Sequence, residues 1–275
     1  MPVALIVLGT MLVALGGPPP LQSDAADSEN ARTLVVKALK QAKWNEEQRF
    51  PSRFRSLMTR TMRRFDSDGE ITEEDIGDYE VVPIDGAPYE RRLTVNGRPL
   101  SQEEQEGELG REAEFREELR KQREYPKDQE SDEDNRLVFN EELIERYEFI
   151  LESTETFRGR RSYRISFRPR PGNLPVRRRI DYALNKAKGL IWLDCETLEA
   201  ARIEFELIEK VRLWWGVFGN IANARGSLDR GPVLRNIWSQ LQLETYTDIR
   251  VLLSRTRRAE IRRWHSYTLI TDNEE

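Results

Sequence analysis

Apolar and polar residues alternate one by one in two segments of the chain, 162–169 and 201–210. In each segment the apolar side chains share one face of an extended backbone, while arginine, serine and glutamate side chains occupy the other face. A period of two with one polar face predicts antiparallel strands that bury one side only. The apolar positions are Tyr163, Ile165, Phe167, Ile203, Phe205 and Leu207.

Shorter apolar runs predict further strands, separated by tight turns. Asp68-Gly69 is a strong signal for a hairpin turn between two strands, and Asn96-Gly97 is a second turn signal. Residues 189–204 have the pattern strand, turn, strand. Residues 219–232 contain three glycines, and we expect a mobile loop there. The other expected strands lie at 54–62, 79–84, 90–95, 211–218, 241–249 and 251–267.

Apolar residues spaced by three and four predict helices at 31–50 and 140–151. A further helix is expected at 101–134, where Ser101 and Glu104 form a capping box. Its apolar residues are too few for a core helix, so we expect a solvated, charged helix that projects from the domain. A coiled-coil partner is the alternative, although the apolar positions do not sustain heptads.

The chain begins with an apolar run at residues 3–15 (VALIVLGTMLVAL), followed by two glycines and three prolines. The run is shorter than the roughly 20 residues that cross a bilayer, and it fits the apolar region of a secretory signal. We therefore expect residues 1–26 to be a signal peptide or a short N-terminal apolar segment, and the protein to be exported. A short membrane anchor and a buried core segment are the alternatives.

A strand–turn–strand signature occupies Gly189–Glu204 (GLIWLDCETLEAARIE). It resembles the outer-membrane lipoprotein-sorting proteins of the LolA/LolB type, in which a tryptophan-bearing strand ends in Asp and the strand after the turn opens with Arg. Here these residues are Trp192, Asp194 and Arg202. The order of elements is also similar: an export signal, an N-terminal helix, strands, central helices and a β-rich C-terminal half.

The resemblance implies a mainly β fold with flanking helices. The expected architecture is an open, curved antiparallel half-barrel with helices over its concave face. Residues 27–275 would form this single domain, with a charged helical insertion at 101–135 that the family lacks. The resemblance also implies that the space between sheet and helices holds acyl chains of lipoproteins in the periplasm of a Gram-negative envelope.

Charge is divided unevenly along the chain, whose net charge is −5. Residues 157–275 hold 23 Lys and Arg against 14 Asp and Glu, whereas residues 1–156 hold 21 against 35. An acidic half and a basic half indicate that the two face each other or a polarised partner. The overall acidity argues against nucleic acid, because it repels phosphate at long range.

Residues that could support catalysis or bind a metal are scarce. Cys195 is the one cysteine and His265 the one histidine, which excludes an internal disulfide and a His- or Cys-based metal cluster. The segment 66–75 has part of the spacing of a calcium loop, but Arg64 stands at the first ligand position. We therefore expect no catalysis, no metal and no cofactor. An envelope enzyme that uses His265 or a carboxylate pair is the least favoured alternative.

Apolar residues on the expected strands are candidates for a ligand-binding wall, although inward-facing aromatic residues are usually core. The candidates are Met58, Met62, Tyr163, Ile165, Phe167, Trp192, Ile203, Phe205, Leu207, Trp215 and Trp238. Arginines on the last strand are candidates for contact with lipid head groups or an acidic partner, the alternative being a solvated sheet face. These are Arg255, Arg257 and Arg263.

These observations favour a non-catalytic periplasmic carrier for lipoprotein acyl chains or another lipid. The alternative is an envelope module for protein–protein interaction or sensing on the same fold, with a protein partner and peripheral membrane contact.

Overall fold

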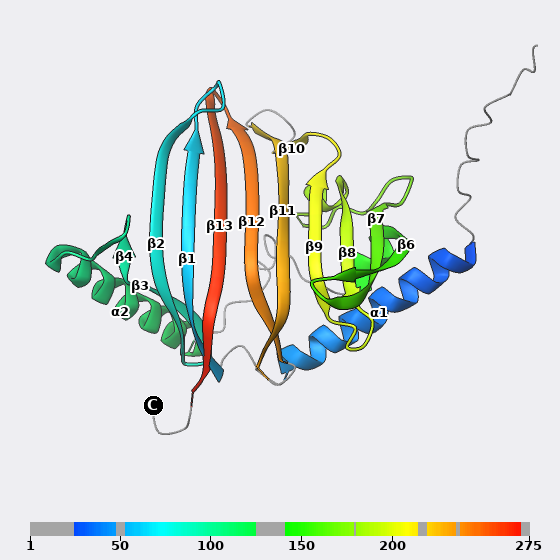
Figure 1. Ribbon diagram of the computed structural model, residues 1–275. Coiled ribbons are helices and arrows are strands. Elements are labelled where there is room, and N and C mark those ends of the chain that lie inside the picture. Colours follow the sequence, from blue (N-terminus) through cyan, green and yellow to red (C-terminus); the bar gives the residue numbers. More distant parts are fainter. Residues whose placement is uncertain are drawn as a thin grey trace, which may run out of the picture.

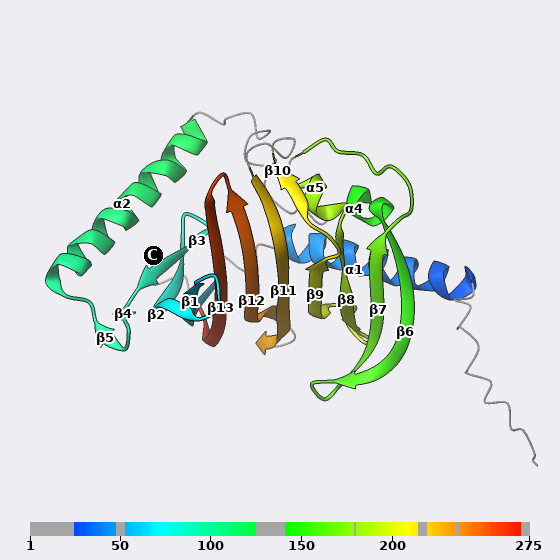
Figure 2. The ribbon, with the colours of Figure 1, turned by 90° about the horizontal axis from the view of Figure 1, so that it is seen from above.

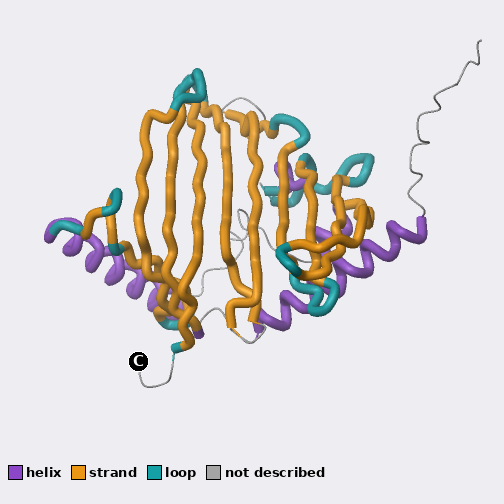
Figure 3. Tube along the Cα trace, in the orientation of Figure 1, coloured by secondary structure: helices purple, strands orange, loops and turns teal. Residues whose placement is uncertain are grey.

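The computed structural model describes residues 25–47, 53–124, 141–178, 180–213, 219–234 and 237–270. Strands make up most of this part of the chain: eleven of them form one large antiparallel sheet, and β4 and β5 form a separate two-stranded sheet (Figure 1, Figure 3). The strand order is β3-β2-β1-β13-β12-β11-β9-β8-β7-β6, and β10 pairs with β11. The sheet remains open, with β3 and β6 at its two edges. The expected mainly β, open antiparallel fold is confirmed.

Most of the strands are joined by short turns. The strands are β1 (Phe54–Phe65), β2 (Ile71–Ile84), β3 (Ala87–Arg92), β4 (Thr94–Val95), β5 (Arg98–Pro99), β6 (Tyr147–Phe157), β7 (Arg160–Pro169), β8 (Ala187–Asp194), β9 (Ala200–Leu207), β10 (Val211–Leu213), β11 (Gly219–Leu234), β12 (Ile237–Val251) and β13 (Ser254–Leu269). The helices are α1 (Ala25–Glu47), α2 (Gln102–Glu124), α4 (Glu141–Arg146) and α5 (Asp181–Leu184). None of the helices in these described ranges combines the length and apolar character needed to span a bilayer.

The first strand pairs with the last. β1 lies antiparallel to β13, with a register that runs from Phe54 opposite Leu269 to Phe65 opposite Arg257. This long-range pairing brings the hairpin β1–β2 into the same sheet as the C-terminal strands (Figure 1). The acidic and basic halves of the chain therefore meet within one sheet.

The main core lies between α1 and the β6–β9 end of the sheet (Figure 1, Figure 2). Leu34, Val35 and Leu39 form a stripe at helical spacing and are buried on this face. They belong to the same cluster as Ile165 and Leu193, which point inward from β7 and β8. The alternating pattern of these strands thus supplies one wall of the core, and the stripe of α1 supplies the other.

Helix α2 packs against β2 and β3 at the other end of the sheet (Figure 1). Its capping box is formed as expected, because the Ser101 amide donates to Glu104 at 2.8 Å and the Glu104 amide donates to the Ser101 hydroxyl at 3.3 Å. The Phe115 ring packs on Tyr89 at a tilt of 44°, with ring centroids 5.1 Å apart, and Leu119 joins this small apolar cluster.

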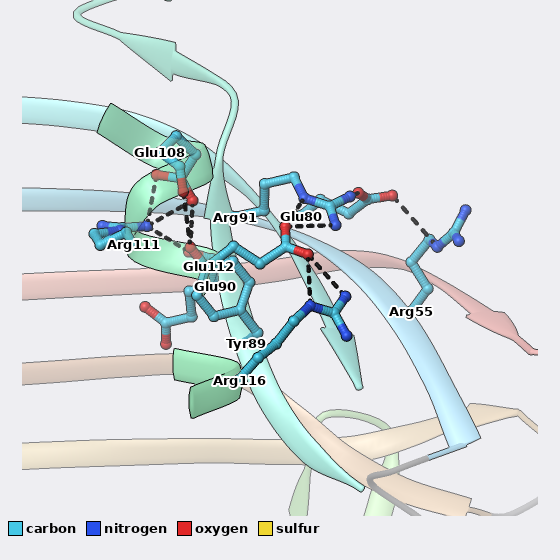
Figure 4. A network of polar contacts seen from close by, with 9 residues as sticks. All are labelled: Arg55, Glu80, Tyr89, Glu90, Arg91, Glu108, Arg111, Glu112 and Arg116. Carbon is cyan, nitrogen blue, oxygen red and sulfur yellow. Dashed lines mark hydrogen bonds and ion pairs between the residues drawn. The ribbon is translucent and has the colours of Figure 1, made fainter. Parts of the chain in front are cut away.

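Ion pairs and hydrogen bonds surround the apolar contact of α2 (Figure 4). Arg91 of β3 lies 3.0 Å from Glu112, and the Tyr89 hydroxyl donates to Glu108 at 2.7 Å. The helix therefore does not simply project into solvent as expected. Two apolar residues suffice for docking because charged side chains around them are paired with the sheet.

Three expectations about local structure have definite outcomes. The hairpin at Asp68-Gly69 is confirmed, and its turn is held by Asp66, whose carboxylate accepts the amides of Asp68 and Glu70, each at 2.9 Å. The expected helix at 140–151 ends at Arg146, because Tyr147 begins β6 and pairs with β7. The expected loop at 219–232 is part of the long strand β11, because pairing with β9 and β12 overrides its glycine content.

Glycines and phenylalanines alternate along one row of cross-strand neighbours. Phe167 lies opposite Gly189, Gly189 opposite Phe205, and Phe205 opposite Gly226. A methyl group on Gly189 would lie 1.8 Å from the Glu204 carbonyl oxygen and 2.6 Å from the Phe167 ring. The missing side chain therefore makes room for the phenylalanine ring of the neighbouring strand.

We expect Gly189→Ala to lower the free energy of unfolding by about 3 kcal/mol or more, the upper end of the range for overpacking, because the methyl group meets a backbone oxygen that cannot rotate away. Urea denaturation followed by circular dichroism measures this change. Gly110→Ala is the matched control: it lies in α2 with no atom near the added methyl group, and it should stabilise the protein by about 1 kcal/mol. Equal midpoints for the wild type and Gly189→Ala would contradict the close packing at this row.

Candidate functional site

An apolar cavity of about 450 Å³ lies between α1 and the sheet. Its size falls within the range of ligand pockets, which is about 300–1,000 Å³. Almost every side chain that lines it is aliphatic or aromatic. These come from α1 (Val35, Ala38, Leu39), from α4 and α5 (Leu143, Ile144, Ala183, Leu184) and from the sheet (Phe149, Phe167, Ile191, Leu193, Ile203, Phe205, Leu207, Ile221, Ala224, Leu228).

A buried ion pair fixes the part of the cavity wall that α4 and α5 provide. Arg146 of α4 lies 3.2 Å from Asp181 of α5, and both side chains are almost fully buried. Burial raises the pKa of Asp181, but hydrogen bonds from the amides of Arg178 and Arg177 and the charge of Arg146 outweigh it, so the pKa lies below its usual value. The pair therefore holds the two short helices together as one unit.

One charged pair stands among the described residues that line the cavity. Arg230 of β11 donates to the Glu199 carboxylate at 2.7 Å, and its other terminal nitrogen donates to the Trp238 carbonyl oxygen at 3.4 Å. Glu199 is buried, with 5% of its side chain exposed, and the Arg230 side chain is 21% exposed. The cavity thus combines an apolar wall with one charged pair, beside the hydroxyl of Tyr147, which donates to the Leu184 carbonyl oxygen at 2.7 Å.

Four of the residues expected in a ligand wall line this cavity: Phe167, Ile203, Phe205 and Leu207. Two others belong to the surrounding core cluster, where Ile165 is fully buried and Tyr163 is partly buried. The structure therefore brings together the apolar faces of the two alternating segments, which lie on β7 and β9.

The remaining candidates lie elsewhere. Trp192 points to the opposite face from Ile191 and Leu193, and it packs with Trp238 and Phe157. The two methionines lie on β1, where Met58 is fully buried between Trp264 and Tyr79, and Met62 is opposite Glu260 of β13. Trp215 lies outside the described residues. The apolar pattern alone does not show on which face, or at which end of the sheet, a residue lies.

The candidate arginines on β13 are engaged with neighbouring groups. Arg255 and Arg257 lie 2.6 Å and 3.4 Å from the Asp248 carboxylate. The hydrogen bond from Arg255 lowers the pKa of Asp248 below its usual value. Arg263 is more exposed and donates to Gln242 at 3.3 Å. In the structure Arg255 and Arg257 are therefore the ion-pair partners of the buried Asp248 carboxylate.

The residues of α1, α4 and α5 that line the cavity are not among the candidates that the sequence indicates for a ligand-binding wall. The spacing of apolar residues in α1 predicts a helix that covers the sheet, but it does not indicate a cavity. Leu143 and Ile144 lie on a short helix whose apolar residues also suit a core, and Ala224 lies in the segment expected to be a loop. Only the packing of α1, α4 and α5 on the sheet shows that these residues face a space.

A second, larger cavity of about 950 Å³ opens across the other face of the sheet. Its walls carry charged residues of both signs, among them Glu152, Glu204, Arg168 and Arg225, beside apolar residues such as Leu190 and Ile261. Hydrocarbon transferred to such a surface would displace hydration water from charged groups, which opposes binding. The smaller cavity is therefore the better candidate for an apolar ligand, despite its size.

Groups that could bind a metal or catalyse a reaction are sparse in the described part of the chain. No cluster of three or more His, Cys, Asp or Glu residues with the geometry of a metal site occurs there. His265 is exposed on β13, opposite Leu57 of β1.

The signature Trp192, Asp194 and Arg202 is built into the turn and the sheet. Asp194 is 1% exposed, accepts a 2.5 Å hydrogen bond from Arg160, and accepts the Thr197 amide and hydroxyl at 2.8 and 2.9 Å. Burial raises the pKa of Asp194, but these hydrogen bonds outweigh it and lower the pKa below its usual value. Arg202 pairs with Asp229 at 2.9 Å. Asp194 therefore anchors the β8–β9 turn, and Arg202 links β9 to β11.

No protein-family model matches this sequence, and no curated protein matches it. Several solved structures are similar in fold. A DUF1329 family protein from Desulfovibrio piger is 12% identical, covers 90% of this chain and 94% of its own, and has a TM-score of 0.35. A LolA superfamily protein from Nitrosomonas europaea is 12% identical over 88% of this chain and 94% of its own, with a TM-score of 0.30.

The MucA/MucB complex of Pseudomonas aeruginosa contains a similar chain, 11% identical over 88% of this chain and 99% of that one, with a TM-score of 0.25. At these identities and TM-scores the similarity concerns the fold alone and carries no argument about a ligand or a partner.

We expect Asp194→Asn to lower the free energy of unfolding by about 1.5–3 kcal/mol near neutral pH, because it removes charged hydrogen bonds from a buried turn. The folded-state pKa of Asp194 is depressed, so its contribution exists above the unfolded pKa of about 3.9 and is lost as the pH falls through the folded value. Urea denaturation at several pH values should show the difference between wild type and variant shrinking in acid.

Glu196→Gln is the control for the Asp194 experiment. Glu196 pairs with the same Arg160 at 2.9 Å, but its side chain is 82% exposed. An exposed pair of this kind contributes little, so the control should change stability by less than about 0.5 kcal/mol. If the free energies of unfolding of the wild type and Asp194→Asn differ by the same amount at every pH, the ionic role of Asp194 is refuted.

Proposed function

We propose that this protein is a non-catalytic carrier that holds an acyl chain or another lipid hydrocarbon between α1 and the sheet. The observation that supports the proposal is the 450 Å³ cavity, whose walls are almost entirely aliphatic and aromatic. A cavity of this kind favours hydrocarbon without directional contacts, because the gain comes from apolar surface removed from water.

The apolar run at residues 3–15 supports export, so the proposed location is the periplasm of a Gram-negative envelope. Lipid carriage has a physical purpose there, because acyl chains that cross an aqueous compartment must be shielded from water. The acyl chains of lipoproteins are the proposed cargo. We further propose that residues 27–275 act as one domain, with the charged helix at 101–135 as an insertion.

Saturated fatty-acid methyl esters of increasing length should bind with increasing affinity. Each buried CH₂ group contributes about 0.8 kcal/mol, so the affinity should rise about fourfold per carbon until the cavity is full and then level off. Displacement of a fluorescent apolar dye from the purified mature protein measures this series. A well-folded protein that binds neither the dye nor any of the esters would refute the carrier function.

Filling the cavity should abolish ester binding without unfolding the protein. Ala224 lines the cavity from β11, and Ala224→Phe would place a ring in that space. We expect the ester affinity to fall at least tenfold in dye displacement. Asn223→Phe is the matched control, because this neighbouring residue is exposed and does not line the cavity. Equal losses in both variants would point to a site other than this cavity.

A further inference from the structure

The pair Glu199–Arg230 is the charged feature among the described residues that line the apolar cavity. Glu199 directly precedes β9, which begins at Ala200, and Arg230 reaches it from β11. A carrier for hydrocarbon alone has no need of such a pair in its wall. Its chemistry therefore bears on which end group of the ligand the cavity accepts.

A free carboxylate on the ligand would meet an unfavourable site. To pair with Arg230 it would have to displace Glu199, whose side chain is 5% exposed and whose carboxylate would lose this cation. To bind beside the existing pair it would lie close to the negative charge of Glu199, where like charges repel in a poorly solvated space. Either route opposes a charged end group.

A neutral carbonyl would meet a favourable site. A guanidinium group has five N–H donors, and Glu199 and the Trp238 carbonyl oxygen each accept from one of its terminal nitrogens. The bond to Trp238 is long, at 3.4 Å. An ester or amide oxygen can therefore accept a hydrogen bond from Arg230 while the ion pair stays intact.

We propose that the Glu199–Arg230 pair makes the cavity select neutral acyl derivatives, esters or amides, over free fatty acids. The inference rests on the proposed carrier function and specifies its ligand class: a chain whose carbonyl carries no charge. Glu199 is the residue that sets this specificity, because it cancels the attraction of Arg230 for an anion.

The experiment compares three probes of equal chain length: dodecanoate, methyl dodecanoate and N-methyldodecanamide. Binding is measured by dye displacement at about pH 8, where a carboxylic acid with an ordinary pKa near 4 is ionised. We expect the wild-type protein to bind at least one neutral probe about tenfold or more tightly than dodecanoate. The tighter of the two neutral probes distinguishes an ester ligand from an amide ligand.

Glu199→Gln tests the role of the pair directly. It leaves the charge of Arg230 without its anion, so dodecanoate should gain at least tenfold in affinity and the neutral probes should change by less than about threefold. Glu206→Gln is the matched control: it removes a carboxylate from the same strand, where Glu206 pairs with Lys188 at 3.1 Å and does not line the cavity. The control should keep the wild-type preference.

Each outcome bears on one idea. Equal affinity of the wild type for the acid and the neutral probes, or an unchanged preference in folded Glu199→Gln, overturns the proposed selectivity but leaves the carrier function intact. Binding of none of the probes overturns the carrier function itself. If circular dichroism shows that Glu199→Gln does not fold, the ratio measured for the wild type decides the proposal.

Discussion

The burial of the apolar stripe of α1 on one end of an open sheet is the constraint on which the cavity depends. The sheet does not close on itself, so the inward faces of β6 to β9 must be covered by other elements. A single helix and two short ones cover a curved surface incompletely, because round helices and a twisted sheet do not match in shape. The space that remains is lined by the same residue types that form the core.

The high charge content of the chain is compatible with this fold because its buried carboxylates are paired. In the described part of the chain, each buried acidic residue lies in an ion pair with an arginine: Asp181, Asp194, Glu199, Asp229 and Asp248. Contacts also cross between the acidic and basic halves, since Arg262 of β13 lies 2.6 Å from Glu90 of β3. This contact supports the expectation that the acidic and basic halves of the chain face each other.

Pairing also explains why charged residues are poor guides to a binding site in this protein. Arg255 and Arg257 lie two positions apart on β13. From the sequence they are candidates for contact with head groups or a partner, yet both contact Asp248. No pattern in the sequence marks Arg230 as a candidate site residue, yet it lines the apolar cavity. What a charge can do depends on the partner that the fold brings to it, and the partner of Arg230 lies 31 residues away.

The sequence by itself determined the strands with alternating residues, the hairpin at Asp68-Gly69, the capping box at Ser101 and the mainly β class of the fold. These follow from local periodicity and turn chemistry, which act over a few residues. Tertiary structure alone decided that residues 219–234 form a strand and that Tyr147 begins β6 instead of continuing a helix. It also decided that Phe205 lines the cavity while Trp192 lies on the opposite face. These outcomes depend on cross-strand neighbours and on helices distant in the sequence, and no local pattern encodes such contacts.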